Sequence, residues 1–282
     1  MLRHVAGFEW RYQLRSPVFW VGCALFFLIT FGAATIDQIQ IGGRGNVFVN
    51  SPYTILQTLS VLSLFSIFVI VAMVASVVIR DDETGFAPII RVTSVGKFSY
   101  LVGRFAGASA AALGVLAMVP LAIAIGAQMP WLDPEKVGPF RIGDYVYALF
   151  AFGLPTLLII AAGYFALATA TRSMMWTYVG AAATLIAYLA MRFALSDPQF
   201  DTVSALIDPF GRSTLIIVTK YWTATERNTL LPPMSGLLLA NRVLWSAVAI
   251  ALFALAYRRF RFEQPGARAA RRTAAEDTAP PD

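Results

Sequence analysis

The side chains that could do chemistry in this 282-residue chain fall into three groups. The first is a charged stretch that contains Arg80, Asp81, Asp82, Glu83, Gly85 and Arg91. The second is a polar row inside an apolar stretch and consists of Thr54, Gln57, Ser60, Ser63 and Ser66. The third lies in a long mixed segment and comprises Asp208, Pro209, Phe210, Gly211, Tyr221, Trp222, Glu226, Arg227, Asn241 and Arg242. Charged groups of this kind bind a partner through charge-assisted hydrogen bonds, whereas hydroxyl and amide groups line a path or join helices.

None of these groups has the pattern of a catalytic or metal site. The sequence has no Gly-rich phosphate loop ending in Gly-Lys-Ser/Thr, no His-Glu-x-x-His zinc helix and no Gly-x-Ser-x-Gly elbow. The single histidine, His4, cannot build a multi-histidine metal site. The single cysteine, Cys23, cannot form a disulfide within the chain. We therefore expect no enzymatic activity, no cofactor and no metal, and we expect ATP to be neither bound nor hydrolysed by this chain.

The composition predicts that helices in a bilayer position the three groups. Hydrophobic residues make up 58% of the chain and charged residues 13%, about half the charged share of a soluble domain. Six stretches reach the roughly 20 apolar residues that a helix needs to cross the hydrocarbon core. They are residues 18–36, 53–79, 103–127, 146–170, 174–195 and 237–257. The expected fold is an all-α polytopic membrane protein with six transmembrane helices.

Local signals accompany several of these spans. Ser16-Pro17 and Ser51-Pro52 each place a capping hydroxyl before a proline at the first helical position. Pro155 lies inside the fourth span and is expected to kink it. Gly103 and Gly107 match the Gly-x-x-x-Gly pattern of closely packed membrane helices, which would suit a dimer face.

The charges outside the spans predict an orientation. With the N-terminus inside, the inner segments hold fourteen of the 22 Lys and Arg residues, and the acidic residues divide equally between the two sides. The inner segments therefore carry the whole net charge of +6. Because basic loops remain in the cytoplasm, both termini are expected to be cytoplasmic.

The first sixteen residues are expected to form an interfacial helix. Met1, Val5, Phe8 and Tyr12 fall on one stripe at helical spacing, and flanking basic residues could reach lipid phosphates. An ordinary basic leader before the first span is the alternative. A cleaved signal peptide is a further alternative for the first span, although its apolar run exceeds the roughly 7–15 residues of a signal peptide.

Each candidate group has a purely structural interpretation and a functional one. Residues 80–100 either form a solvated loop or fold a short helix along the membrane that offers carboxylates to a partner. The polar row either lines a conduit or, as we favour, makes hydrogen bonds between helices. Arg242 lies about one turn inside the sixth span, where a long side chain can reach the outer interface, and we favour that interpretation over a site.

Two segments outside the spans need separate treatment. Residues 196–236 are too long for a simple connection in a compact bundle, and they mix apolar runs with turns and interfacial aromatics. A re-entrant helix pair or a small external cap would both explain this mixture. Residues 263–282 are rich in Ala, Pro and charge, which predicts a disordered tail after one domain over 1–262.

Taken in order along the chain, these motifs resemble the ABC-2 type permease family, the membrane subunits of ATP-driven exporters. The matching features are a basic interfacial helix at 8–17, two spans, the charged stretch at 80–85, residues 99–104 leading into the third span, and the long segment before the sixth. A second set at 208–211, 221–223, 226–229 and 241–242 is similar to permease halves of bacterial permease/zinc-aminopeptidase fusion proteins. This chain has no peptidase motif, so the peptidase activity does not carry over.

The resemblance implies a permease subunit of the bacterial inner membrane that forms an export path. It would act as a homodimer, or paired with a similar half, beside cytoplasmic ABC ATPase subunits. Residues 80–100 would be the coupling loop that contacts the ATPase, and the re-entrant segment would close the outer end. Lipid is then the surrounding partner, and nucleic acid is not a partner. A membrane scaffold that anchors or regulates a partner enzyme is the alternative, and the sequence identifies no substrate.

Overall fold

The computed structural model describes residues 1–36, 41, 45–83 and 96–260, without the side chains of residues 81–83. Every regular element in these residues is a helix. Among the described residues, six helical stretches are long and apolar enough to cross a membrane. They are Pro17–Thr35, Pro52–Arg80, Lys97–Gly126, Ile142–Thr171, Met174–Ala194 and Gly236–Arg259. These stretches confirm the all-α polytopic fold and overlap the six spans predicted from the sequence. The proposed tail over 263–282 lies outside the described residues.

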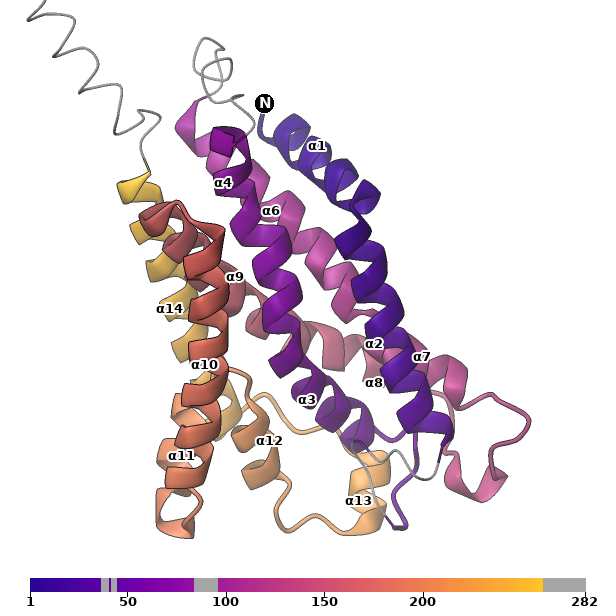
Figure 1. Ribbon diagram of the computed structural model, residues 1–282. Helices are drawn as coiled ribbons and strands as arrows, with labels where there is room; N and C mark the ends of the chain where they lie inside the picture. The colour runs from indigo at the N-terminus through magenta and orange to yellow at the C-terminus, as the bar shows by residue number, and fades with distance from the viewer. Residues whose placement is uncertain (37–40, 42–44, 84–95, 261–282) are drawn as a thin grey trace, which may run out of the picture.

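The helices form one bundle with both described ends of the chain on the same side (Figure 1). We call this side the terminal end and the opposite side the distal end. The first half contains α1 (Leu2–Arg15), α2 (Pro17–Thr35), α3 (Pro52–Ile70), α4 (Ser76–Glu83), α6 (Lys97–Leu116) and α7 (Met118–Gly126). The second half contains α8 (Ile142–Tyr147), α9 (Leu154–Thr171), α10 (Met174–Ala194), α11 (Asp201–Ile207), α12 (Arg212–Val218), α13 (Ala224–Thr229) and α14 (Gly236–Arg259).

The capping signals predicted for the first two spans are confirmed. Ser16 accepts a hydrogen bond from the Val18 N–H at 3.3 Å, and Ser51 accepts one from the Thr54 N–H at 3.1 Å. Pro17 and Pro52 follow these caps in the first helical turn. The missing proline N–H costs nothing there, because a first-turn donor has no partner within the helix.

Two helices are interrupted by π-helical turns. One turn, η1 (Val71–Ala75), joins α3 to α4, and the other, η3 (Ala148–Gly153), joins α8 to α9. The second turn ends next to Pro155, which lies in the first turn of α9. Because proline lacks an N–H, it cannot donate a hydrogen bond to the carbonyl oxygen four residues earlier. The regular pattern of helical hydrogen bonds is therefore interrupted at the place where the sequence predicts a kink.

Close packing of α1 along α6 explains the Gly-x-x-x-Gly pattern. A Cβ added at Gly103 would lie 2.8 Å from Val5 Cβ, and one added at Gly107 would lie 2.5 Å from the Ala6 carbonyl oxygen. The two glycines therefore admit the N-terminal helix of the same chain. The suggestion that they form a dimer face is wrong, because α1 already covers that face.

The N-terminal helix is confirmed as a helix, but its polar side faces inward. Glu9 and Gln13 are buried against the bundle, whereas Met1, Phe8 and Tyr12 of the predicted apolar stripe are exposed. Exposed apolar side chains also cover much of α10 and α14. This arrangement suits a lipid environment, where apolar side chains can face outward and polar groups must find partners inside.

Residues 196–236 form a group of short helices at the distal end (Figure 1). α11 and α12 pack against each other and against α14, while α12 and α13 contact α3. The segment begins with a single 3-10 turn, η4 (Pro198–Phe200). Each helix here is only six or seven residues long, so none of them crosses a bilayer by itself.

Candidate functional site

A buried charge cluster at the terminal end joins α1 to the helices on either side of residues 84–95. Glu9 on α1 is 0% exposed. One oxygen of its carboxylate lies 2.7 Å from an Arg80 nitrogen and 2.6 Å from an Arg104 nitrogen. Gln13, one turn along α1, donates to the other carboxylate oxygen at 2.8 Å. A single carboxylate thus bonds to groups on three different helices.

The same cluster ties α1 to the π-helical turn. Gln13 also donates to the Met73 carbonyl oxygen at 3.0 Å, and Ser76 donates to that oxygen at 3.2 Å. A π-helical turn displaces carbonyl groups from the regular ladder, which leaves them available to side-chain donors. The hydrogen bond from Gln13 therefore uses a group that the local irregularity of η1 supplies.

Aromatic rings surround the two guanidinium groups. The Arg80 guanidinium carbon lies 3.8 Å from the centre of the Tyr12 ring. The Arg104 guanidinium carbon lies 5.6 Å from the centre of the Phe8 ring and 5.4 Å from that of Tyr100. The aromatic rings add cation–π attraction and limit access of water, which strengthens the ion pairs with Glu9. We call Glu9, Gln13, Arg80 and Arg104 the Glu9 cluster.

Much of the predicted coupling loop lies outside the described residues. Arg80 belongs to the Glu9 cluster, but Gly85 and Arg91 are not described. The backbone of Asp81, Asp82 and Glu83 continues α4, so the expectation that the loop begins at Arg80 is wrong. The helix extends further because residues 76–83 contain no proline or glycine to end it.

The polar row on α3 is buried, and among the described residues its serines donate no hydrogen bond to another helix. Ser60 donates to the Leu56 carbonyl, Ser63 to the Leu59 carbonyl and Ser66 to the Ser63 carbonyl. Each hydroxyl donates its hydrogen bond to a carbonyl oxygen three or four residues earlier in the same helix, as serines in membrane helices do. Hydrogen bonding between helices, favoured from the sequence, is therefore wrong for these three residues.

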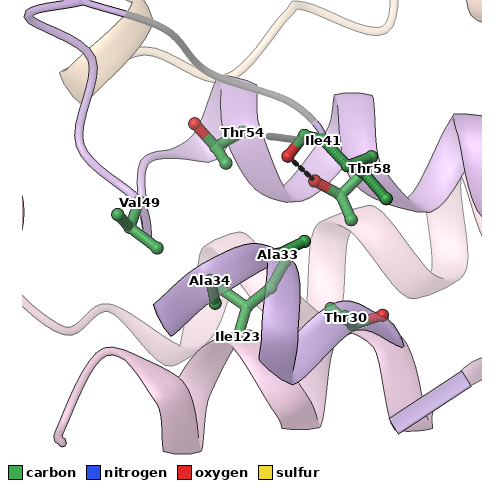
Figure 2. A pocket seen from close by; sticks show the side chains of 8 residues that line it. All are labelled: Thr30, Ala33, Ala34, Ile41, Val49, Thr54, Thr58 and Ile123. Atoms are coloured by element: carbon green, nitrogen blue, oxygen red, sulfur yellow. Dashed lines mark hydrogen bonds between the residues drawn. The ribbon is translucent and has the colours of Figure 1, made fainter. Parts of the chain in front are cut away.

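The start of the polar row borders a small cavity near the distal end. Its volume is about 10 Å³, and it lies between α2, α3 and α7. Figure 2 shows the side chains that line it, which belong to Thr30, Ala33, Ala34, Ile41, Val49, Thr54, Thr58 and Ile123. The Thr58 hydroxyl donates to the Ile41 carbonyl at 3.1 Å. Such a space admits about one water molecule and is too small for an organic substrate.

At the distal end, Asp208 organises the turn between α11 and α12. Its carboxylate accepts hydrogen bonds from the N–H of Phe210 at 2.8 Å and from the N–H of Ser213 at 2.6 Å. The Tyr188 hydroxyl lies 3.5 Å from the same carboxylate. Asp208 is 0% exposed. The structure thereby confirms the turn predicted at 208–211, and the Asp208 carboxylate accepts from the first turn of α12, whose N-cap residue is Gly211.

Asn241 and Trp245 attach α14 to this turn. The Asn241 side-chain amide donates to the carbonyl oxygens of Ala205 at 2.7 Å and Asp208 at 2.9 Å. The Trp245 indole donates to the Leu206 carbonyl at 3.0 Å. The last carbonyl groups of a helix have no partner within that helix, and α14 supplies donors for those of α11.

Arg242 lies inside the bundle, and the sequence-based expectation that it reaches the interface is wrong. It is 4% exposed, donates to the Thr156 hydroxyl at 3.1 Å, and lies 5.0 Å from the centre of the Phe152 ring. A Cβ at Gly211 would fall on its guanidinium group, and Gly211 has a φ of +70°. Position 211 therefore needs glycine both because its φ is positive and because a side chain there would occupy the place of the Arg242 guanidinium.

Glu226 and Arg227 make contacts that hold the outer part of this segment together. Glu226 forms a capping box with Thr223 at the start of α13, and the two backbone bonds measure 2.7 and 3.2 Å. The Arg227 guanidinium carbon lies 4.9 Å from the centre of the Tyr53 ring on α3. Trp222 is partly exposed and Tyr221 is strongly exposed.

Sequence reasoning missed several residues of both sites. Glu9 and Gln13 were not singled out, although Glu9 is the first acidic residue of the chain and the next one is Asp37. An isolated carboxylate among basic residues, with an amide one helical turn later, is the signal that could have identified the pair. Tyr188 and Arg192, also four residues apart, carry a comparable signal on the fifth span.

No family model and no curated protein matches this chain.

Proposed function

We propose that this chain is the membrane-spanning permease subunit of an ABC-type exporter, with ATP hydrolysis on a separate cytoplasmic subunit. The membrane-length helices and the order of motifs support this function. The observation that carries the proposal is the Glu9 cluster, because it joins the N-terminal helix to both helices that border residues 84–95. A partner that moves those residues would move α1, α4 and α6 together.

The terminal end is the side on which such an ATPase would bind. The sequence assigns fourteen of the 22 basic residues to the inner segments, which favours a cytoplasmic location for this side. Asp81, Asp82 and Glu83 end α4 there and would pair with basic groups of the ATPase. The proposed assembly contains a second permease half, either the same chain or a similar one, and is located in the bacterial inner membrane.

The direct test is to purify the chain from its native membrane in mild detergent and to identify the proteins that remain bound. The proposal expects an ATPase subunit and ATP hydrolysis by the complex, whereas the chain alone should hydrolyse no ATP. Recovery of a protease or another enzyme without an ATPase would contradict the permease function and favour a membrane scaffold.

A residue-level test addresses the contact with the ATPase. The triple variant Asp81→Asn, Asp82→Asn, Glu83→Gln should keep normal membrane expression but bind the ATPase at least about tenfold more weakly, because each charge-assisted hydrogen bond contributes about 1.5–3 kcal/mol. The matched control is Asp133→Asn with Glu135→Gln, two exposed carboxylates between α7 and α8. If the triple variant binds the ATPase as strongly as the control, these carboxylates are not the contact.

A further inference from the structure

The distal end holds more positive charge than its buried carboxylate can neutralise. Arg212 on α12 and Arg242 on α14 lie near Asp208, and Arg192 on α10 lies near Arg212 and Tyr188. The carboxylate of Asp208 is already occupied by backbone N–H groups. Within the described part of the chain, none of these arginines forms an ion pair with Asp208.

Several guanidinium N–H groups in this region have no hydrogen-bond acceptor among the described residues. They belong to Nη1 of Arg192, Nε of Arg212, and both Nε and Nη2 of Arg242, and each of these atoms is buried. Arg242 is itself 4% exposed. A buried donor without an acceptor is unfavourable, and the penalty is greater for a charged group. These four atoms therefore favour an acceptor that is not part of this polypeptide.

The electrostatic environment points to an anion. Burial lowers the pKa of Arg212 from its ordinary value, and repulsion from Arg192 lowers it further. An added negative charge would relieve both effects, because it would stabilise the two guanidinium groups at once. Arg192 and Arg212 are only partly buried, so part of each side chain is exposed to a group that arrives from outside the bundle.

We propose that Arg192, Arg212 and Arg242 bind a phosphate group at the distal end of the bundle, beside the Asp208 turn. Guanidinium groups bind phosphate oxygens through paired, charge-assisted hydrogen bonds. Three guanidinium groups with four unused nitrogen atoms match the several acceptor oxygens of a phosphate better than the two of a carboxylate. The Tyr188 hydroxyl lies close to both Arg192 and Asp208. It would therefore stand between the proposed anion and the carboxylate of Asp208. This inference does not depend on the export function.

The phosphate could belong to a lipid headgroup or to a water-soluble molecule, and two measurements distinguish these sources. In the first, the full chain is reconstituted in nanodiscs of mixed phosphatidylglycerol and phosphatidylcholine and is then released from them. Native mass spectrometry identifies the lipids that remain bound to it. In the second, the chain in dodecyl maltoside micelles, which contain no phosphate, is titrated with glycerol phosphate, and binding is followed by the increase in unfolding temperature. Selective retention of phosphatidylglycerol indicates a headgroup, and stabilisation by glycerol phosphate indicates a soluble anion.

Variants connect either signal to the proposed residues. Arg192→Gln and Arg212→Gln should each weaken binding roughly tenfold, since each removes a charge-assisted contact. Lys220→Gln is the matched control, because Lys220 is exposed in the same segment and pairs with Asp201 at 2.8 Å. Arg212→Lys retains the charge but loses the forked geometry, so it should bind several-fold more weakly than the native chain.

Two results would overturn the proposal. One is that neither phosphatidylglycerol nor glycerol phosphate binds the native chain. The other is that binding occurs but both glutamine variants bind as well as the Lys220 control. Because Arg192 and Arg212 are partly exposed, their single substitutions should leave the bundle folded, and the Arg212→Lys variant provides a measurement with the charge kept in place.

Discussion

Glu9 and Asp208 are both fully buried carboxylates, but the two ends of the bundle use them differently. Glu9 bonds to side chains from distant parts of the sequence, at separations of 71 residues for Arg80 and 95 for Arg104. Asp208 bonds to backbone N–H groups two and five residues away. The first carboxylate holds three helices together, whereas the second shapes one turn and forms no ion pair with the neighbouring arginines in the described part of the chain.

This difference teaches that burial alone does not reveal what a charged group does. A buried carboxylate that pairs with cations fixes the relative positions of the elements that carry those cations. One that caps a helix stabilises a local conformation and hardly affects distant segments. The terminal end is therefore suited to transmit movement between helices, and the distal end holds guanidinium groups that have no ion-pair partner among the described residues.

The largest effect is expected from Glu9→Gln. The glutamine keeps the size and one acceptor oxygen but removes the charge, so Arg80 and Arg104 lose the carboxylate that both contact. Breaking such a buried charge cluster costs about 3–5 kcal/mol in the free energy of unfolding. Chemical unfolding in detergent micelles measures this loss, with the exposed Glu135→Gln as control. A loss below about 1 kcal/mol would show that Glu9 contributes no more to the free energy of unfolding than an ion pair on the surface does.

A smaller effect is expected from Gly107→Ala at the contact between α1 and α6. The added methyl group would lie 2.5 Å from the Ala6 carbonyl oxygen and 2.8 Å from Glu9 Cβ. Overpacking of this kind costs about 1–3 kcal/mol and would shift Glu9 away from the two arginines. Gly7→Ala is the control on α1, because nothing lies within 4 Å of its added Cβ. Equal stability of the two variants would contradict tight docking of α1.

The six spans and the two Ser-Pro caps could be predicted because they depend on runs of adjacent residues. The Glu9 cluster could not, because its ion pairs join residues far apart in sequence and depend on how α1 docks. Arg242 shows the same limit. From sequence its place near a helix end indicated access to the interface, but the fold covers that end with α11 and α12. The burial of Arg242 depends on this covering.

A third variant, Asp208→Asn, compares the two carboxylates directly. Asparagine keeps the oxygen that accepts from the Phe210 N–H, but it replaces the oxygen that accepts from the Ser213 N–H by an NH2 group, which cannot accept. The expected loss is about 1–2 kcal/mol. This is well below the loss expected for Glu9→Gln, because no arginine of the described residues forms an ion pair with Asp208. Asp201→Asn, which affects an exposed pair with Lys220, is the control. A loss equal to that of Glu9→Gln would mean that Asp208 neutralises the distal arginines after all.

The smallest effect is expected from replacing the serines of α3. Each hydroxyl of Ser60, Ser63 and Ser66 bonds to a carbonyl of its own helix, so alanine removes a donor without leaving a second helix unsatisfied. Each substitution should change the free energy of unfolding by no more than about 0.5 kcal/mol, since such bonds back to the helix add little stability. ATP hydrolysis by the proposed complex should also be unchanged. A large loss of stability would indicate that the serines join helices in another conformation. A loss of transport with normal stability would instead indicate that the serines line the proposed export path. The middle of the bundle would then contribute to function together with the sites proposed at its two ends.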